Sequence, residues 1–274
     1  MSVKKSIFGF GFFCISIFVF FVPFIYVFLM ASKGGVEASL LEFSVPSEWM
    51  FFENLIEVVK ARDYMILKAY LNSIIMTVGS ISILVVLSAM IGYVLDRRKG
   101  LVSNLVFYFI LFGLMIPPAV VPTIWLLKET YLFKTMTGMI LIQVAYGLSF
   151  CVLLFKSFIS SIPKDLDEAA IVDGASPMQV FFKVIFPLMM PITVTVILVQ
   201  SVAIFNDFTN PLYYLPGKDN VTVQLTLYNF QSQFSSQVNL LFMNILLVTI
   251  PPLIVFAFYN KKIVSGMTAG AVKG

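Results

Sequence analysis

Long runs of apolar residues constrain the fold of this chain more than any other feature. Several of them reach the ~20 residues that an α-helix, rising ~1.5 Å per residue, needs to cross a hydrocarbon core ~30 Å thick. Charged residues make up only 12% of the sequence, well below the roughly 25% found in soluble domains. We therefore predict an all-α membrane protein.

Six of these runs are read as transmembrane helices. The first follows Lys4 and Lys5, is longer than the ~7–15 residues of a signal-peptide core and lacks a clear cleavage site, so we expect a retained anchor. Pro117-Pro118 and Pro251-Pro252 predict bends in the third and sixth helices, because proline disturbs the backbone hydrogen bonds. The predicted spans are residues 6–30, 70–95, 103–127, 137–158, 184–205 and 238–259.

The distribution of basic residues predicts the orientation. An even number of spans places both termini on one side, and eleven of the 18 Lys and Arg residues fall on that side. The compact Arg97-Arg98-Lys99 cluster in a short loop is the firmest indicator, because basic loops stay in the cytoplasm. We expect a multi-pass protein of the cell (inner) membrane with both termini in the cytoplasm.

The predicted organisation follows from these spans. In the first loop, Phe51, Leu55, Val58 and Val59 recur at helical spacing, which predicts an external amphipathic helix that packs on the spans. A platform for a ligand is the alternative for this helix. We assign residues 1–30 to an N-terminal transmembrane helix, 31–69 to an extracytoplasmic segment, 70–260 to a transmembrane core and 261–274 to a cytoplasmic tail.

The composition argues against most catalytic chemistry. The chain has no histidine, the commonest general base and metal ligand. Cys14 and Cys151 lie inside apolar runs, where a buried small side chain is the simplest interpretation. No stretch fits the G-x-x-x-x-G-K-[ST] phosphate-binding loop, so any ATP is expected on another chain. We expect no catalytic, metal or cofactor site and no nucleic-acid partner.

A short polar segment, residues 161–183, interrupts this apolar chain between the fourth and fifth spans. Its acids, Asp165, Asp167 and Glu168, are expected in the first turn of a helix, where carboxylates stabilise the positive end of the helix dipole. Gly174 is expected to end that helix in the left-handed conformation. Ser176 and Gln179 then have the spacing of a capping box that begins a second helix.

Leu166, Ala169 and Ala170 form a narrow apolar stripe on the first of these helices. Their small side chains would allow another protein to approach closely, so the segment is read as a docking surface. A surface hairpin that packs on its own spans is an equally good interpretation from the residues alone.

The stretch Glu168-Ala169-Ala170, Gly174 and Val184-Ile185-Phe186-Pro187 resembles the EAA motif of permease subunits of binding-protein-dependent ABC importers. Val184 and Phe186 stand where that pattern favours isoleucine and leucine, and both stay apolar. The resemblance implies the type I importer permease fold and a coupling helix that inserts into a separate ATPase. It assigns this coupling role to Glu168, Ala169, Ala170, Asp173, Gly174 and Pro187.

The same resemblance implies several partners. Such permeases work as a pair of similar membrane subunits over two ATPase subunits, and an extracytoplasmic binding protein delivers the solute. ATP and Mg are held by the ATPases, so this chain itself is expected to contain no cofactor.

Further stretches are similar to the carbohydrate-importer permeases of the second maltose and multiple-sugar type. They are "YLNSIIMT" from Tyr70, "IPPAVVPTIWLL" from Ile116, "FNDFTNPLYYL" from Phe205 and the tail "IVSGMTAGAVKG" from Ile263. Phe205 replaces the tryptophan usual in that family. The resemblance implies a sugar or oligosaccharide as cargo, with a non-sugar solute as the alternative. A secondary transporter is the weaker rival, because the spans hardly contain an acid and contain no histidine for an ion relay.

Polar residues within or next to the spans are candidates for the substrate pathway, because such groups usually face a cavity or a partner rather than lipid. Helix capping, helix-to-helix hydrogen bonds and interfacial aromatic belts are the alternative explanations. The polar candidates are Asn72, Gln200, Asn206 and Asp207, and Phe205 is a candidate because sugars bind on aromatic faces.

Overall fold

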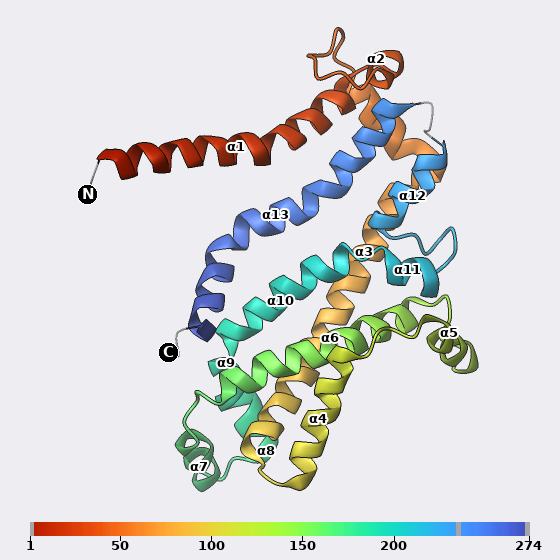
Figure 1. Ribbon diagram of the computed structural model, residues 1–274. Coiled ribbons are helices and arrows are strands. Elements are labelled where there is room, and N and C mark those ends of the chain that lie inside the picture. The colour runs from red at the N-terminus through yellow and green to blue at the C-terminus, as the bar shows by residue number, and fades with distance from the viewer. Residues whose placement is uncertain (1–2, 234–236, 272–274) are drawn as a thin grey trace. The chain divides into compact units, whose positions relative to one another are not determined.

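A computed structural model of the chain describes residues 3–233 and 237–271, and the regular structure in these ranges is entirely helical (Figure 1). The elements are α1 (Val3–Ser32), α2 (Gly35–Ser39), α3 (Phe51–Arg97), α4 (Leu101–Met115), α5 (Val120–Glu129), α6 (Met136–Ile159), α7 (Asp165–Val172), α8 (Pro177–Gln179), the π-helix η1 (Val180–Ile185), α9 (Phe186–Leu188), α10 (Met190–Phe205), α11 (Thr209–Tyr214), α12 (Val223–Gln233) and α13 (Val238–Ala271).

The chain forms two compact units, which are described separately. The first unit comprises residues 1–70 and 223–251, and the second comprises residues 71–222 and 252–274. Helices α3 and α13 each contribute to both units. The candidate sites lie in the second unit.

Each predicted span falls on helical chain, but the helices differ in how well they fit a membrane. By length and apolar composition, α3 and α6 could each cross a bilayer alone. The pair α4 and α5, bent by 116°, and residues 177–188 with α10, bent by 76°, qualify only as broken spans. The apolar segments Phe18–Ser32 and Val238–Ile254 are shorter. The number of transmembrane helices therefore stays a prediction.

The prolines act differently in the two helices where bends were predicted. Pro117 and Pro118 lie in the non-helical stretch between α4 and α5, so the bend predicted for the third span is confirmed. Helix α13, in contrast, stays helical through Pro251 and Pro252 and continues to Ala271. The predicted tail is thus helical as far as Ala271, and residues 272–274 lie outside the described chain.

A π-helix and a turn interrupt the predicted fifth span, residues 184–205. Residues 180–185 form a π-helix, and the chain turns at Met189 before α10 begins at Met190. Pro187 and Pro191 flank this turn, and neither can donate a backbone hydrogen bond. Residues 184–188 therefore lie before the turn and qualify with α10 only as parts of a broken span.

Close packing of α3 against α6 forms the centre of the second unit. A Cβ atom on Gly92 would lie 2.9 Å from the backbone nitrogen of Lys156, and one on Gly147 would lie 2.9 Å from Cδ2 of Leu84. Only glycine allows the two backbones to approach this closely. Cys151 is buried in this core, as predicted, whereas the side chain of Cys14 lies outside the described residues.

In the first unit, the predicted amphipathic helix is the beginning of α3. Helical backbone is interrupted at Ala61–Tyr64, which separates this short helix from the apolar part of α3. Val58 is fully buried, and Asn54 donates hydrogen bonds to the carbonyls of Ala31 (2.8 Å) and Lys33 (2.9 Å). These contacts support packing on the chain itself over a free ligand platform.

Candidate functional site

The polar segment between α6 and α10 folds as the sequence predicted around Gly174. Gly174 has φ +82°, its N–H donates to the carbonyl of Ile171 (2.9 Å), and the N–H of Ala175 donates to that of Ala170 (3.0 Å). These two bonds define a Schellman motif, which ends α7 in a left-handed residue. The prediction that glycine closes this helix is confirmed.

The predicted capping box is also present. The N–H of Ser176 donates to Oε1 of Gln179 (2.9 Å), and the N–H of Gln179 donates to Oγ of Ser176 (3.4 Å). Pro177 occupies the first helical position, where its missing N–H costs nothing. Regular helix α8 is short, however, because the chain continues as the π-helix η1. Helix α7, the glycine turn and α8 are named the EAA hairpin below.

One face of the EAA hairpin is open to its surroundings. Glu168, Ala169, Asp173 and Gly174 are exposed, and Ala170 is half-buried. Exposed apolar side chains lie among them, with Ile171 60% and Val172 86% exposed. The structure thus brings the EAA residues together on one hairpin, whereas Pro187 lies on the separate helix α9.

The predicted apolar stripe does not face the core. Leu166 is 40% exposed and Ala169 is exposed, while the residue that turns inward is Asp167, only 7% exposed. Ala170 and Ala175 do pack against the core of this unit. The EAA hairpin therefore combines an inward face, anchored by a carboxylate, with an outward face that carries exposed small and apolar side chains.

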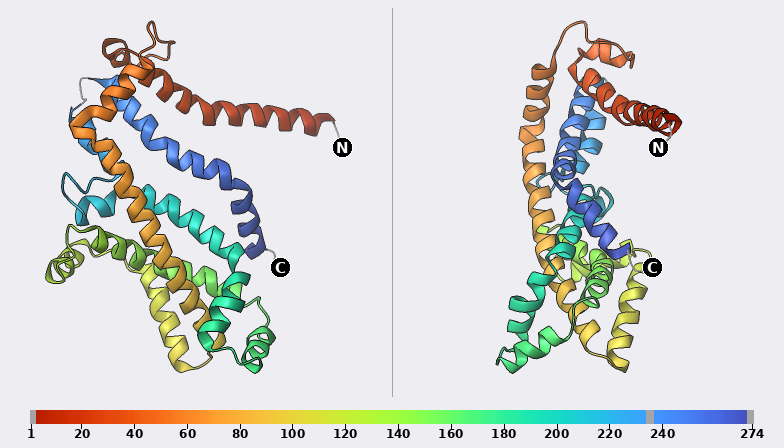
Figure 2. Two further views of the ribbon diagram at one scale, coloured as in Figure 1. Left: turned by 180° about the vertical axis from the view of Figure 1, so that it is seen from behind. Right: turned by 90° about the vertical axis from the view of Figure 1, so that its left-hand side faces the viewer.

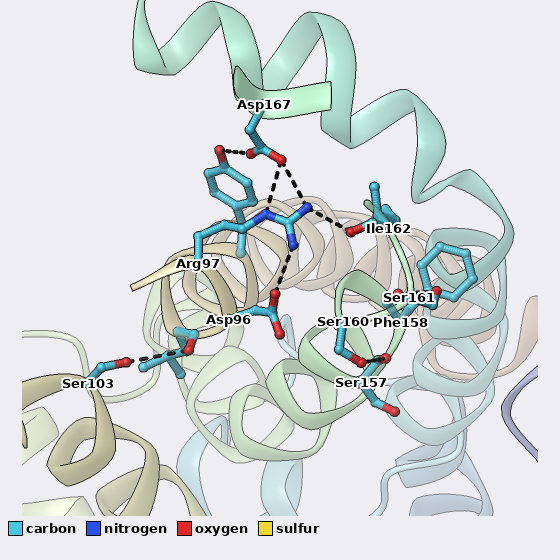
Figure 3. Close-up of polar contacts among 11 residues, drawn as sticks. Asp96, Arg97, Ser103, Ser157, Phe158, Ser160, Ser161, Ile162 and Asp167 are labelled. Carbon is cyan, nitrogen blue, oxygen red and sulfur yellow. Dashed lines mark hydrogen bonds and ion pairs between the residues drawn. The ribbon is translucent and has the colours of Figure 1, made fainter. Parts of the chain in front are cut away.

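Arg97, at the C-terminal end of α3, binds the inward carboxylate (Figure 3). Its Nη2 and Nε lie 2.9 Å and 3.1 Å from Oδ2 of Asp167. The hydroxyl of Tyr93, one turn earlier in α3, donates to Oδ1 of the same carboxylate. Two side chains of α3 thus hold α7 through one acid.

The remaining donors of Arg97 are also used. Its Nη1 pairs with Asp96 (2.9 Å), and its Nη2 donates to the carbonyl of Ile162 in the loop before α7 (3.1 Å). The guanidinium therefore joins the end of α3 to both the loop and the first turn of the EAA hairpin. The ends of α3 and α7 and the start of α4 lie at the same end of the second unit in all views (Figures 1 and 2).

The sequence did not reveal this ion pair. Arg97 was counted with the basic loop and Asp167 with the acids of the helix start, and the two lie 70 residues apart. The one available signal was spacing, because Asp167 precedes Ala170 by three residues and so shares its face of the helix.

At the end of α10, Asp207 is held by neutral donors. Its Oδ2 accepts hydrogen bonds from Nε2 of Gln143 on α6 and Nδ2 of Asn210, both at 2.6 Å. Its Oδ1 accepts from the backbone N–H of Asn210 (3.1 Å), so Asp207 caps the start of α11. Neighbouring Asn206 is exposed and Phe205 is half-buried.

The other two pathway candidates lie elsewhere. The Nδ2 of Asn72 donates to the carbonyls of Asp219 (2.8 Å) and Val221 (3.0 Å), which ties α3 to the loop before α12. Gln200 is only 8% exposed and lies next to Gly147 on α6. The structure therefore groups Phe205, Asn206 and Asp207, and the substrate role of all five candidates stays a prediction.

The end of the second unit that contains Asp207 also holds a buried phenol. Tyr214, 1% exposed, lies 3.0 Å from the hydroxyl of Tyr146. Burial, reinforced by this hydrogen bond, raises the pKa of Tyr214 to about 12, so it is a neutral hydrogen-bonding group. Within the described residues, no group of three His, Cys, Asp or Glu could hold a metal ion.

Comparison with known sequences identifies relatives along most of the chain. A family profile described as "Binding-protein-dependent transport system inner membrane component" matches residues 85–267. A diacetylchitobiose uptake system permease protein of Streptomyces coelicolor is 30% identical over 256 residues, covering 92% of this chain and 84% of the relative. A melibiose/raffinose/stachyose import permease protein of Bacillus subtilis is 28% identical, covering 93% and 92%.

Solved structures support the same fold. A chain from a bacterial ABC transporter that imports the acidic polysaccharide alginate superposes with a TM-score of 0.81 at 20% identity, covering 95% of this chain and 98% of the other. A chain from an alginate ABC transporter in complex with an alginate pentasaccharide-bound periplasmic protein gives 0.68 at 13% identity, covering 94% of both.

Proposed function

The chain belongs to the family of inner membrane components of binding-protein-dependent transport systems, and we propose that it is the permease subunit through which an ATP-driven importer moves a sugar or oligosaccharide. The observation that carries the proposal is the match, over more than nine-tenths of the chain, to permeases named for diacetylchitobiose and for melibiose, raffinose and stachyose. A permease for a non-sugar solute is the second candidate, because the EAA segment itself says nothing about the cargo.

The proposed partners are a second, similar permease subunit, two ATPase subunits that hold ATP and Mg, and an extracytoplasmic sugar-binding protein. One solved neighbour is described together with a pentasaccharide-bound periplasmic protein, which supports the last of these. The end of the second unit with the EAA hairpin is proposed to face the cytoplasm. This orientation also places the basic Arg97-Arg98-Lys99 cluster in the cytoplasm, as the sequence predicted.

In the proposed mechanism the EAA hairpin docks on the ATPase through its outward face. Glu168, Ala169, Asp173 and Gly174 are exposed there, and small side chains permit close approach. Movement of the ATPases on ATP binding would displace the EAA hairpin as a rigid body, because the Schellman motif and the capping box fix its two halves. The paired Arg97 and Asp167 would pass this displacement to α3, so that the spans switch access between the two sides.

The coupling proposal is tested on the double variant Glu168→Ala, Gly174→Ala. We expect loss of ATPase copurification or of sugar-stimulated ATP hydrolysis, measured on the reconstituted complex with its binding protein. A matched control is Asp165→Ala, an exposed acid of the same helix outside the EAA motif. Unchanged assembly and transport in the double variant would argue strongly against coupling through this hairpin.

The cargo and the energy source need a separate measurement. Uptake of labelled oligosaccharides into proteoliposomes should require ATP and persist when ion gradients are collapsed. Uptake that continues without the ATPase but stops with the ion gradient would instead identify a secondary transporter. Binding of sugars by the binding protein encoded beside this chain distinguishes a sugar permease from one for another solute.

A further inference from the structure

A groove of about 670 Å³ opens between the last turns of α3 and the first turns of α4 in the second unit. Its walls are apolar, and its mouth is basic. The apolar lining includes Leu87, Ile91, Val94, Val102 and Val106, and the part lined by the polar residues Arg98, Lys99 and Ser103 is named the mouth. A site with this composition suits a molecule with a hydrocarbon body and a negatively charged head.

The two cations at the mouth differ from their neighbour Arg97. Arg97 pairs with Asp96 and Asp167, and its side chain is only 12% exposed (Figure 3). Arg98 and Lys99 are both exposed, and within residues 3–233 and 237–271 neither side chain has an ion pair or hydrogen bond. Because Asp96 is bonded to Arg97, the nearest acid in sequence does not neutralise the mouth. The groove therefore keeps its positive charge free for a ligand.

The depth of the groove matches one leaflet of a bilayer. Leu87 lies ten positions before Arg97, the last residue of α3, which corresponds to ~15 Å at ~1.5 Å per residue, and Arg98 follows directly. This is about half of the ~30 Å hydrocarbon core. An acyl chain lying along α3 from the mouth to Leu87 would thus reach about the middle of the membrane.

Helix α4 adds an apolar wall that the chain itself leaves open. No residue of Leu101–Met115 is buried, and Val102 is 76% exposed. In water such a surface would be unfavourable by roughly 25 cal/mol per Å² of apolar area. In a membrane it is in its natural environment, and the adjacent cations select which lipid occupies the groove.

We propose that the groove between α3 and α4 binds one anionic phospholipid of the cytoplasmic leaflet. Its phosphate is held by Arg98 and Lys99, and one acyl chain lies against Leu87, Ile91, Val94 and Val106. Basic residues next to a transmembrane helix each contribute ~1 kcal/mol to attraction of anionic lipid. The inference rests on α3 and α4 lying in the membrane and does not depend on which solute is transported.

The site also has a physical connection to the coupling machinery. Arg98 follows directly after Arg97, the residue that holds the EAA hairpin through Asp167. A lipid bound here would stabilise the last turn of α3, and hence the position of the Arg97 side chain. Lipid binding is therefore expected to stabilise the complex against heat as well as to be detectable directly.

The test uses the complete importer complex in a neutral detergent, titrated with phosphatidylglycerol and, separately, with phosphatidylcholine. Native mass spectrometry counts bound lipids, and thermal unfolding measures stabilisation. Arg98→Gln, Lys99→Gln removes both cations at the mouth. The matched control is the double variant Lys164→Gln, Lys183→Gln. It removes two exposed cations of the polar segment 161–183, which do not line the groove.

We expect phosphatidylglycerol to bind about 30-fold more weakly to the Arg98, Lys99 variant, since two cations at ~1 kcal/mol each give that factor. The control should bind as the wild type does. A second variant, Val106→Phe, narrows the groove without changing charge and should also reduce retention of the lipid.

Three results would overturn the proposal. Equal binding of both lipids would remove the role of charge, and stabilisation by inorganic phosphate alone equal to that by lipid would remove the role of the acyl chain. Disulfide crosslinking of a Val102→Cys variant to the second permease subunit in high yield would show that another protein covers the groove.

Discussion

Two carboxylates in the second unit, Asp167 and Asp207, are both held by hydrogen bonds from distant helices, but their partners differ in charge. Asp167 is bonded to the Arg97 guanidinium and to a phenol. Asp207 is bonded to the side-chain amides of Gln143 and Asn210 and to a backbone N–H. The first site has one cation, which Asp167 shares with Asp96, whereas the second has no cation among these partners.

This difference suits the two sites to different work. A buried carboxylate is costly unless it is paired and hydrogen-bonded. Pairing with Arg97 and the bond from Tyr93 make Asp167 a fixed joint between α7 and α3, because both of its carboxylate oxygens are already bonded. Asp207 gains stabilisation without being neutralised, so it can attract a polar solute or a partner at its end of the unit. We expect changes at Asp167 to affect coupling and changes at Asp207 to affect recognition.

The largest effect is expected from Arg97→Ala, because it leaves Asp167 buried without its cation. Breaking a buried ion pair on one side costs about 3–5 kcal/mol. The temperature at which the purified complex unfolds in neutral detergent should fall markedly. ATP hydrolysis should no longer drive uptake. Lys183→Ala is the control, since that side chain is exposed and has no ion pair in the described chain, and it should cost less than about 0.5 kcal/mol.

The double variant Arg97→Met, Asp167→Leu separates a mechanical role from simple destabilisation. Replacing both members of a buried pair by apolar side chains is often neutral or stabilising. We therefore expect the double variant to regain part of the thermal stability, with some loss remaining because Asp96 and the Tyr93 hydroxyl are left without these partners. Recovery of stability with coupling still lost would assign the pair to transmission, and full recovery of both would reduce it to a packing contact.

Asp207→Asn is expected to have the next largest effect. The side-chain amides of Gln143 and Asn210 donate to the Asp207 carboxylate, and in the variant they would face a neutral amide. Charge-assisted hydrogen bonds worth about 1.5–3 kcal/mol each are therefore weakened. Because Asp207 is half-buried, the lower end of that range is expected. Stimulation of ATP hydrolysis by the loaded binding protein should fall, while ATPase assembly is retained.

Asp219→Asn serves as the control for Asp207, since this acid is exposed in the loop before α12. It should change neither stability nor stimulation. If Asp207→Asn uncoupled the ATPase in the same way as Arg97→Ala does, the proposed division of labour between the two carboxylates would be wrong.

The features that sequence predicted well are the local ones. The left-handed Gly174 and the capping box of Ser176 and Gln179 depend on residues within a few positions of one another, so their spacing carries the information. The break at Pro117 and Pro118 is predictable for the same reason, since proline acts on its own helical turn.

The features that sequence missed depend on contacts far apart in the chain. Arg97 lies 70 residues from Asp167, and Gln143 lies 64 residues from Asp207. Nothing in a local pattern selects these distant partners. The apolar stripe left open whether α7 docks on another protein or packs on its own spans, and the structure exposes Leu166 and Ala169 while Ala170 packs against the core. The π-helix and the turn at Met189 lie within the predicted fifth span, and they were missed because apolar composition alone cannot distinguish a bent segment from a straight one.

Gly174→Ala tests the rigidity of the EAA hairpin with a smaller effect. A Cβ at this position meets nothing within 4 Å, so the cost comes only from the left-handed backbone, about 1–2 kcal/mol. Gly174→Asn should cost less, because asparagine tolerates this conformation. The rate of sugar-stimulated ATP hydrolysis should decrease in the order wild type, Gly174→Asn, Gly174→Ala. An equal loss in both variants would point to contact with the ATPase rather than to the backbone.

The smallest effect is expected at the capping box. Ser176→Ala removes the hydroxyl that accepts a hydrogen bond from the N–H of Gln179, and this bond is long, 3.4 Å. The loss of folding stability should therefore lie near the lower end of the range for helix caps, about 0.5 kcal/mol. Gln179→Ala removes the shorter bond of 2.9 Å to the Ser176 N–H and should cost slightly more. Global unfolding hardly resolves such differences, so hydrogen exchange of the amides of Ser176, Met178, Gln179 and Val180 is the suitable measurement. Faster exchange confined to these amides, with exchange at the Ala175 amide unchanged, would show that the two halves of the EAA hairpin are stabilised independently. If exchange at Ala175 also accelerated, the Schellman motif and the capping box would form one cooperative unit, which is the property that a rigid coupling element needs.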